Sequence, residues 1–437
     1  MSQHHVMTAR ELLPRLDRPL PAWARPLMLG CAVLGLLGFV VILLSDNANR
    51  AWRVYHLNWL YWTGLAQAGV LFSAVTTVAK GRWSAPIRRI GEASVAFLPI
   101  SFALFLVLWL GRAEIFPWIR HPITDVPGKS FWLRDWFLFL RVGAGLVLLQ
   151  GLSLWFVYHS VRPDAALVGA GAKPAVHGLY AWLTRNWAAR GAEFSNQRRQ
   201  TLAPAMIVAY ALVMSLVAFD FVMSLAPFWV SNLLGGFFFM GAWLTGLMSM
   251  ALLMLFWRRH LDLEHVITTT HLHDIGKLCF GFTVFWAYLF FSQFLPIWYG
   301  NLPEEVSFLW LRMASPEWLG ISTAMVLLCF IVPFWGLIGR MPKKTPALLA
   351  TFALVSLAGV WTDRYVFTVP SIVQSAPDLP LGWQEVVITT GFFGLWGLAY
   401  SWFASRFPMI SPTLVEREAE RRAHPHASFD APPPPHV

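Results

Sequence analysis

Long apolar segments recur along this chain and alternate with shorter polar connections. A helix that crosses the hydrocarbon core of a bilayer needs about 20 consecutive, mostly apolar residues. Ten segments meet this requirement, so the pattern predicts ten transmembrane helices. The expected spans are 26 to 44, 57 to 78, 93 to 110, 132 to 159, 202 to 224, 228 to 256, 273 to 299, 317 to 339, 346 to 369 and 385 to 405.

The composition favours an all-α integral membrane protein. The 437 residues are 57% hydrophobic and only 13% charged, whereas an average soluble domain carries about 25% charged residues. The cysteines Cys31, Cys279 and Cys329 form no CxxC or CxxCH motif, so we expect no iron–sulfur cluster and no covalently attached haem. Hydrolase and ATPase functions find no support, because HExxH, GxSxG and phosphate-loop motifs are missing from the sequence.

The histidines bear on a haem held between helices. Such a haem needs His ligands that face each other at membrane depth. All 13 histidines are expected in loops, in the terminal segments or at helix ends. We therefore expect no haem, no metal site and no catalytic residue on this chain.

Basic residues are distributed unevenly between the connections. Cytoplasmic connections of membrane proteins are enriched in Lys and Arg. The N-terminal arm, four alternate loops and the C-terminal tail hold 23 of the 33 Lys and Arg residues. These loops are 79 to 92, 160 to 201, 257 to 272 and 340 to 345. We expect both termini in the cytoplasm, and we attribute the net charge of +10 to this anchoring rather than to binding of nucleic acid.

Three parts are expected along the chain. Residues 1 to 25 form a cytoplasmic arm, and residues 26 to 405 form the transmembrane domain. Within that domain, the loop 160 to 201 is expected to carry a short interfacial helix near 179 to 187. Residues 406 to 437 form a tail that is charged and then rich in proline, which predicts a short helix followed by disorder.

Ionisable residues inside predicted spans are costly in a bilayer and mark candidate sites. Those near the predicted periplasmic side are Asp135, Arg141, Asp220, Asp363 and Arg364. Those near the cytoplasmic start of the span 273 to 299 are His271, His273, Asp274 and Lys277. One interpretation is two aqueous half-channels that exchange protons. The other is that these charges neutralise one another and hold helices together, and the sequence leaves both open.

Two segments carry a family resemblance. Residues 271 to 305 read HLHDIGKLCFGFTVFWAYLFFSQFLPIWYGNLPEE, and residues 218 to 229 read AFDFVMSLAPFW. Both resemble the membrane subunits of alternative complex III, a bacterial quinol:cytochrome c oxidoreductase, within the NrfD-like (polysulfide-reductase-type) family. Of the two such subunits, the chain is most similar to the smaller, ActF-type subunit.

The resemblance implies two four-helix bundles plus two flanking helices in the bacterial inner membrane. It implies no cofactor on this chain, with c-type haems, iron–sulfur clusters and quinol on partner subunits. The implied partners are lipids, multihaem and monohaem cytochrome c subunits, an iron–sulfur subunit, the paralogous NrfD-like subunit and small membrane subunits. A terminal oxidase is a further candidate partner.

Proton routes have been proposed in this family, and the resemblance extends them to Asp220 and to the group from His271 to Lys277. The remaining candidates were chosen by depth alone. Two other functions stay open. A quinol-binding subunit of the same or a related complex would use Asp135, Arg141 and Asp220 to take up quinol protons. A secondary transporter would need a polar site at mid-membrane between discontinuous helices.

Overall fold

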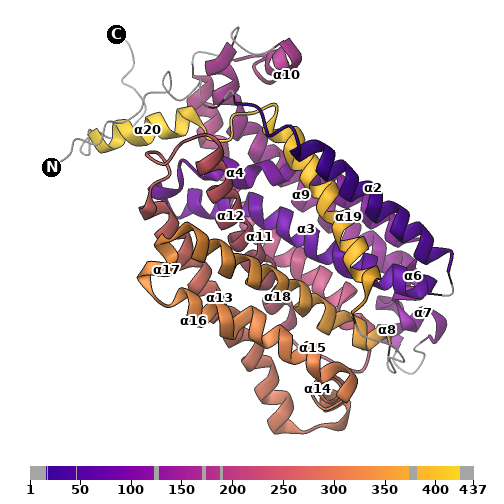
Figure 1. Ribbon diagram of the computed structural model, residues 1–437. Helices are drawn as coiled ribbons and strands as arrows, with labels where there is room; N and C mark the ends of the chain where they lie inside the picture. The colour runs from indigo at the N-terminus through magenta and orange to yellow at the C-terminus, as the bar shows by residue number, and fades with distance from the viewer. Residues whose placement is uncertain are drawn as a thin grey trace.

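The computed structural model describes Leu16 and residues 18–45, 47–122, 127–169, 174–187, 190–373 and 381–423. Within that part of the chain the regular structure is helical, and no residue lies in a strand. The long helices run side by side along a common direction (Figure 1). They are α2 (Ala24–Leu43), α3 (Ala48–Val78), α5 (Leu98–Leu108), α9 (Asp135–Val168), α11 (Gly191–Phe221), α12 (Leu234–His260), α13 (Thr269–Gly300), α15 (Pro316–Val326), α18 (Pro346–Ile372) and α19 (Trp383–Ala404).

Two of these helices continue through shorter elements. Helix α5 follows α4 (Arg88–Glu92) and η2 (Ala93–Phe97), while α15 continues through the π-helix η5 (Leu327–Ile331) into α16 (Val332–Leu337). One end of the bundle, at the upper left of Figure 1, carries short helices and most of the basic connections, and we call it the basic end. Its short helices are α10 (Pro174–Leu183), α17 (Arg340–Lys344) and α20 (Pro412–Ala423). The opposite, aromatic end carries α6 (Arg112–Ile115), α7 (Pro117–Arg120), α8 (Pro127–Trp132) and α14 (Pro303–Met313).

Nine helices of the described part of the chain are long and apolar enough to cross a membrane. Helix α3, the remaining predicted span, is about 46 Å long at 1.5 Å per residue but is not among these nine. Its position explains its polar composition, because every residue from Val54 to Ala74 is buried by other helices. Helix α3 therefore tolerates His56, Asn58 and Gln67.

The long helices pack as two groups of four. Helices α3, α5, α9 and α11 surround one another, and α12, α13, the α15–η5–α16 helix and α18 form a second group. Contacts of α12 with α3 and α11, and of α18 with α3, join the groups. Helices α2 and α19 pair with each other and flank this core. Their approach is close at Gly35, where an added Cβ would lie 2.1 Å from the Cα of Gly391.

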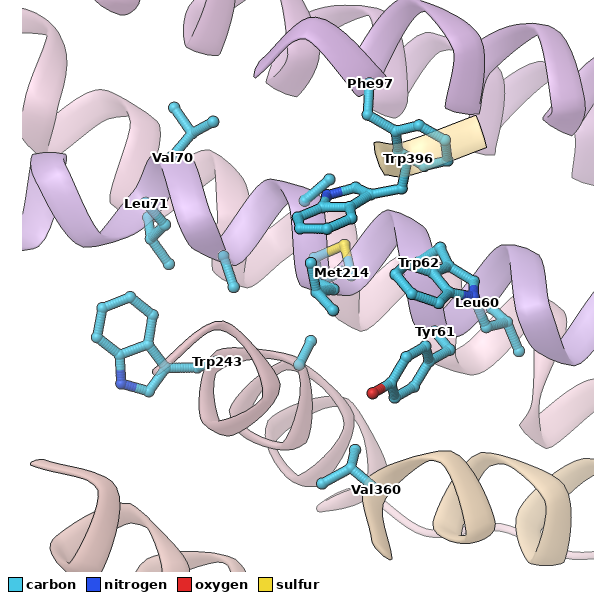
Figure 2. Close-up of a cluster of buried hydrophobic side chains, with 14 of the residues drawn as sticks. Leu60, Tyr61, Trp62, Val70, Leu71, Phe97, Met214, Trp243, Val360 and Trp396 are labelled. Carbon is cyan, nitrogen blue, oxygen red and sulfur yellow. The ribbon is translucent and has the colours of Figure 1, made fainter. Parts of the chain in front are cut away.

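Helix α3 is the centre of the apolar core. Figure 2 shows side chains of α3 pointing toward several neighbouring helices. The Trp62 ring lies 5.8 Å from that of Trp396 on α19, and the Tyr61 hydroxyl donates a hydrogen bond of 3.1 Å to the carbonyl of Leu357 on α18. The central helix thus fixes the positions of both groups of helices and of the flanking pair.

Several predicted helix boundaries differ from those observed. Helix α9 continues to Val168, beyond the predicted end at 159, and α11 begins at Gly191, before the predicted start at 202. The added turns contain charged residues that hydropathy places in a loop. Asp164 and Arg199 are nevertheless buried, where Asp164 accepts a hydrogen bond from Arg89 and Arg199 lies 3.8 Å from Glu92. The short helix predicted at 179 to 187 overlaps α10, which begins at Pro174.

The predicted helix of the tail is confirmed as α20. Its start is held against α9, because the hydroxyls of Ser411 and Thr413 donate hydrogen bonds of 2.9 and 2.6 Å to Oδ1 of Asp164. The predicted disorder after this helix and most of the predicted N-terminal arm lie outside the described residues.

Candidate functional site

Arg141 on α9 and Asp220 on α11 form a bidentate ion pair near the aromatic end. Arg141 Nε and Nη2 donate hydrogen bonds of 2.7 and 2.6 Å to the two oxygens of Asp220. The guanidinium also donates to the carbonyl of Trp132 and lies 4.0 Å from the centre of its ring. Both residues are candidates from the sequence, and because each charge is satisfied by the other, the pair has the geometry of an interhelical clamp.

Asp135, which was grouped with this pair by depth, takes a different partner. Arg112 Nε lies 3.0 Å from Oδ2 of Asp135, and both side chains are one-third exposed. The other oxygen of Asp135 accepts a hydrogen bond from the backbone N–H of Trp136 at the start of α9. A carboxylate is favourable at a helix N-terminus. Asp135 therefore belongs to the surface of the aromatic end.

The predicted group at the basic end lies on the first turns of α13. His271 Nδ1 accepts a hydrogen bond of 3.1 Å from the backbone N–H of Thr268 and so caps the helix. Lys277 Nζ lies 2.7 Å from Oδ1 of Asp274, with the lysine side chain 56% exposed. His273 is partly exposed on the same turns. These residues border the surface of the basic end.

Lys343 on α17 adds a buried charge beside this group. Its Nζ donates a hydrogen bond of 3.0 Å to the carbonyl of Leu337. An added Cβ on Gly276 of α13 would lie 2.8 Å from the lysine side chain, so the two helices touch there. Burial and the nearby charge of Lys277 lower the pKa of Lys343. Lys343 lies in the predicted loop 340 to 345, so the local sequence gives no reason to select it as a candidate.

A second buried cluster was missed because its residues were placed in predicted loops. Arg89 donates hydrogen bonds of 2.9 Å to Glu92 and 2.8 Å to Asp164, and all three side chains are at most 1% exposed. Glu92 also accepts hydrogen bonds from the hydroxyls of Ser73 and Ser160. The cluster ties α3, α4 and α9 together near the basic end, and its carboxylates are fully hydrogen-bonded.

Asp363 on α18 is different, because its carboxylate is fully buried and accepts no hydrogen bond from the part of the chain that the structure describes. Arg364 Nη1 lies 3.3 Å from Oδ2 of Asp363, but neither carboxylate oxygen has a hydrogen-bond partner among the described residues. The Arg364 guanidinium is held elsewhere, since Nη2 donates a hydrogen bond of 2.8 Å to the carbonyl of Phe238. Gly241 makes room for it, because a Cβ there would lie 2.7 Å from Nη2.

The surroundings of Asp363 include a close helix contact. Ser356, Gly359 and Asp363 share one face of α18 by their helical spacing. That face meets the π-helix η5, where an added Cβ on Gly359 would lie 2.5 Å from the carbonyl carbon of Leu328. π-Helical turns inserted in α-helices are frequent at functional sites.

Further polar atoms without partners continue from Asp363 along this contact. The hydroxyls of Ser356 and Ser322 are buried and have no hydrogen-bond partner among the described residues. The thiol of Cys329 is buried in η5, which packs against this face of α18. We call Ser322, Cys329, Ser356 and Asp363 the polar seam. Buried polar atoms of this kind are the usual partners of ordered water.

Along the helix direction, the polar seam extends over the middle of the second helix group. Ser322 lies about 9 Å from the start of α15 at the aromatic end, and Ser356 lies about 15 Å from the start of α18 at the basic end, at 1.5 Å per residue. Of these four residues, only Asp363 is a candidate from the sequence. The signal that could have found Ser356 is its spacing of seven residues from Asp363 within an apolar helix.

Two histidines do not lie where the sequence predicted. His56 is fully buried more than two turns inside α3, and its ring lies 5.8 Å from that of Phe221. His159 lies inside α9, between aromatic neighbours. The expectation that all histidines lie in loops or at helix ends is therefore wrong for these two. Among the described residues, no group of three or more His, Cys, Asp or Glu side chains could hold a metal ion.

The fold and its buried charges define the class of the protein. With nine long apolar helices in its described part, the chain is an all-helical, multi-pass membrane protein. A scan against protein-family models and a search of curated proteins found no match to it.

Proposed function

We propose that this chain is a membrane subunit of a bacterial respiratory quinol:cytochrome c oxidoreductase of the alternative complex III type. Its place is the inner membrane, where α3 is the tenth spanning helix and both termini are cytoplasmic. The similarity of residues 271 to 305 and 218 to 229 to the NrfD-like subunits supports this proposal. The arrangement of two four-helix groups with a flanking pair agrees with the fold that the similarity implies.

In this assembly the chain has two roles. It anchors the cytochrome c, iron–sulfur and paralogous membrane subunits, which carry the haems, the clusters and the quinol. It also conducts protons through the second helix group. Electron transfer takes place on the partners, so the isolated chain is not an enzyme.

The observation that carries the proton role is the buried carboxylate of Asp363, which lies 3.3 Å from Arg364 but has no hydrogen-bond partner among the described residues. Both carboxylate oxygens of Asp220 and both of Glu92 already accept hydrogen bonds from neighbouring side chains. A buried carboxylate without hydrogen bonds costs several kcal/mol unless water or a proton satisfies it. Asp363 therefore has the chemistry of a site that binds and releases a proton, and the polar seam supplies positions for water on both sides of it.

The group at the start of α13 takes the complementary position in this proposal. His271, Asp274 and Lys277 border the surface of the basic end, where water reaches them. They exchange protons with the aqueous phase, and the polar seam carries protons through the membrane interior. Arg141 and Asp220 are assigned to packing.

The test replaces Asp363 in the assembled complex. Asp363→Asn retains the size of the side chain but cannot take up a proton near neutral pH. The complex is purified through a tag on this chain and reconstituted in vesicles, and proton translocation per electron is measured during quinol oxidation. We expect the proton-to-electron ratio to fall and Asp363→Glu to restore it.

Cys279→Ala is the matched control, because it truncates a buried side chain of α13 that lies outside the polar seam and whose thiol keeps its proton near neutral pH. Two results contradict the two parts of the proposal separately. An unchanged ratio and turnover in assembled Asp363→Asn complex would refute the proton role. Purification of the wild-type chain without haem-bearing and iron–sulfur subunits would refute the assignment to the oxidoreductase.

A further inference from the structure

Helix α17 connects two membrane-spanning helices at the basic end (Figure 1). The span before it ends at Leu337, and the span after it begins at Pro346. The whole connection is therefore residues 338 to 345. Because both of its ends continue directly into the membrane, so short a connection stays at the membrane surface.

The length of the preceding span sets the level of α17 more closely. This span, Pro316–Leu337, has 22 residues and is at most about 33 Å long at 1.5 Å per residue. The hydrocarbon core of a bilayer is about 30 Å thick. The span uses almost its entire length to cross the core, so Leu337 lies close to the hydrocarbon boundary. Residues 338 to 345 consequently lie at the level of the lipid headgroups.

Contacts with neighbouring helices hold α17 in a fixed position. The buried Lys343 Nζ donates hydrogen bonds of 3.0 and 3.3 Å to the carbonyls of Leu337 and Ile338. The same side chain packs against Gly276 of α13, and its Nζ lies 5.1 Å from the centre of the Phe280 ring. The exposed residues of α17 are therefore positioned before any ligand binds, which lowers the entropic cost of binding.

Basic residues gather where α17 meets α13. Arg340 and Lys344 are exposed on α17, and Lys277 of α13 follows Gly276, the residue that Lys343 contacts. Burial and then the charge of Lys277 lower the pKa of Lys343, so these two cations repel each other. We call Lys277, Arg340, Lys343 and Lys344 the basic cluster.

Acidic residues of the neighbouring helices do not balance the basic cluster. The helices that pack most closely against α17 are α13, α16 and α18. The acidic residue of α13 is Asp274, which lies 2.7 Å from Lys277. No Asp or Glu occurs between Glu317, at the far end of α15, and Asp363. Asp363 lies about 26 Å from the start of α18 at 1.5 Å per residue, so neither of these two acids reaches the cluster.

The acidic residues before α13 contact other cations. Asp262 lies 2.7 Å from Arg18, and Glu264 lies 3.7 Å from Arg258. The basic cluster together with Asp274 therefore leaves a net charge of +3. A concentration of positive charge at headgroup level favours a ligand with negative charge.

An exposed apolar stripe leads from the membrane interior to the basic cluster. Leu327, Ile331, Trp335 and Ile338 are 44%, 36%, 69% and 51% exposed, and their spacing of three or four residues places them along one side of the α15–η5–α16 helix. Trp335 lies near the hydrocarbon boundary, where tryptophan is enriched in membrane proteins. A surface that is apolar inside the core and basic at its edge has the chemistry of a phospholipid site.

We propose that the basic cluster binds the phosphate group of an anionic phospholipid, whose acyl chain lies along the apolar stripe. The guanidinium of Arg340 donates paired hydrogen bonds to phosphate oxygens, while Lys344 and Lys277 act as point charges. This inference goes beyond the proposed function and needs only that the chain lies in a membrane. It holds or fails independently of the proton role of Asp363 and of the redox assignment.

The experiment compares the full chain with the double variant Arg340→Gln and Lys344→Gln in mild detergent. Both side chains are exposed, and thermal unfolding verifies that the variant is folded. Native mass spectrometry measures the binding of added phosphatidylglycerol and phosphatidylcholine. We expect the wild-type chain to bind phosphatidylglycerol about tenfold more tightly than phosphatidylcholine, and the double variant to lose most of this preference.

The matched control is Lys80→Gln with Arg82→Gln, which removes two exposed charges elsewhere at the basic end and should retain the preference. An unchanged preference in the Arg340 and Lys344 variant would overturn the proposal. An equal loss in the control would assign the effect to overall surface charge and would also overturn it. Displacement of the bound lipid by inorganic phosphate alone would show a site for free phosphate instead.

A photo-crosslinking amino acid at Met341 tests the location of the lipid. Met341 follows Arg340 and is 66% exposed, while the control position, Leu36 on α2, is 64% exposed within a membrane span. The full chain is placed in nanodiscs with equal amounts of phosphatidylglycerol and phosphatidylcholine. We expect the adducts at Met341 to be enriched in phosphatidylglycerol and those at Leu36 to match the mixture. The same adduct composition at both positions would contradict a specific site.

Discussion

Arg141 and Asp220 join α9 to α11 through two parallel hydrogen bonds of 2.7 and 2.6 Å. The two residues are 79 positions apart in the chain, and Asp220 is almost completely buried. Bidentate geometry of this kind fixes both the separation and the relative rotation of the helices. The pair therefore explains two ionisable residues in the first helix group as elements of packing.

Loss of one partner of this pair should destabilise the protein. Asp220→Leu leaves the Arg141 charge without its partner, and we expect the free energy of unfolding to fall by about 3 kcal/mol. Thermal unfolding of the chain in detergent or nanodiscs measures the change. The double variant Arg141→Met with Asp220→Leu should recover part of the loss. If the double variant lost as much as the sum of both single changes, the clamp would be disproved.

The contact of Gly359 with the π-helix η5 gives a second prediction. In Gly359→Ala the new methyl group would meet the backbone of Leu328 at 2.5 Å, which forces α18 and η5 apart. We expect a loss of about 1–3 kcal/mol, as is usual for overpacking, together with altered access of reagents to Cys329. Thermal unfolding and the rate of Cys329 alkylation measure the two effects.

Gly281→Ala is the matched control for Gly359→Ala. It lies within α13, and an added Cβ there would meet no atom within 4 Å. Because alanine has a higher helix propensity than glycine, the control should be neutral or slightly stabilising. Equal stability of the two variants would contradict the close contact at η5.

Arg312 should be essential for holding α14 in place. Its guanidinium donates to the carbonyls of Val366 and Phe367, in the last turns of α18, and to the hydroxyl of Ser371. Arg312 therefore places a cation at the C-terminus of α18, where the helix dipole favours positive charge. Burial lowers the pKa of Arg312. Arg312→Met should cost about 2–4 kcal/mol and make α14 sensitive to protease, because buried carbonyls lose their donors.

Limited proteolysis of the membrane-embedded chain checks this prediction. Arg134→Met, also at the aromatic end, is the control, because Arg134 is exposed and contacts the Phe131 ring at the surface. The control should leave the cleavage of α14 unchanged. Protection of α14 in Arg312→Met equal to that in the wild type would show that other contacts hold this helix.

Several features of the fold could be read from the local sequence. Within the described ranges, apolar segments long enough for a membrane correspond to nine helices, because a lipid-facing helix must be apolar over most of its length. Helix α3 was also placed at 57 to 78, although its start at Ala48 was missed. Hydropathy does not predict the charged ends of helices such as α9 and α11. The charged residues there lie inside the protein, close to opposite charges, rather than in water.

Less of the candidate site could be predicted from the sequence. Depth in the membrane selected Asp220 and Asp363 as equivalent carboxylates. Their partners make them different, since Asp220 accepts two hydrogen bonds from Arg141 and Asp363 accepts none among the described residues. Glu92 and Asp164 were overlooked because local charge density placed them in loops.

The sequence by itself determined that this chain is helical, lies in a membrane and carries its basic residues mainly at one set of connections. These properties depend on the composition of each segment and on the length of its apolar runs, which do not depend on the other segments. The tertiary structure alone decided which charges are satisfied and where the polar seam lies. The physical reason is that hydrogen bonds and close contacts join residues far apart in the chain, as in the pairing of Arg141 with Asp220.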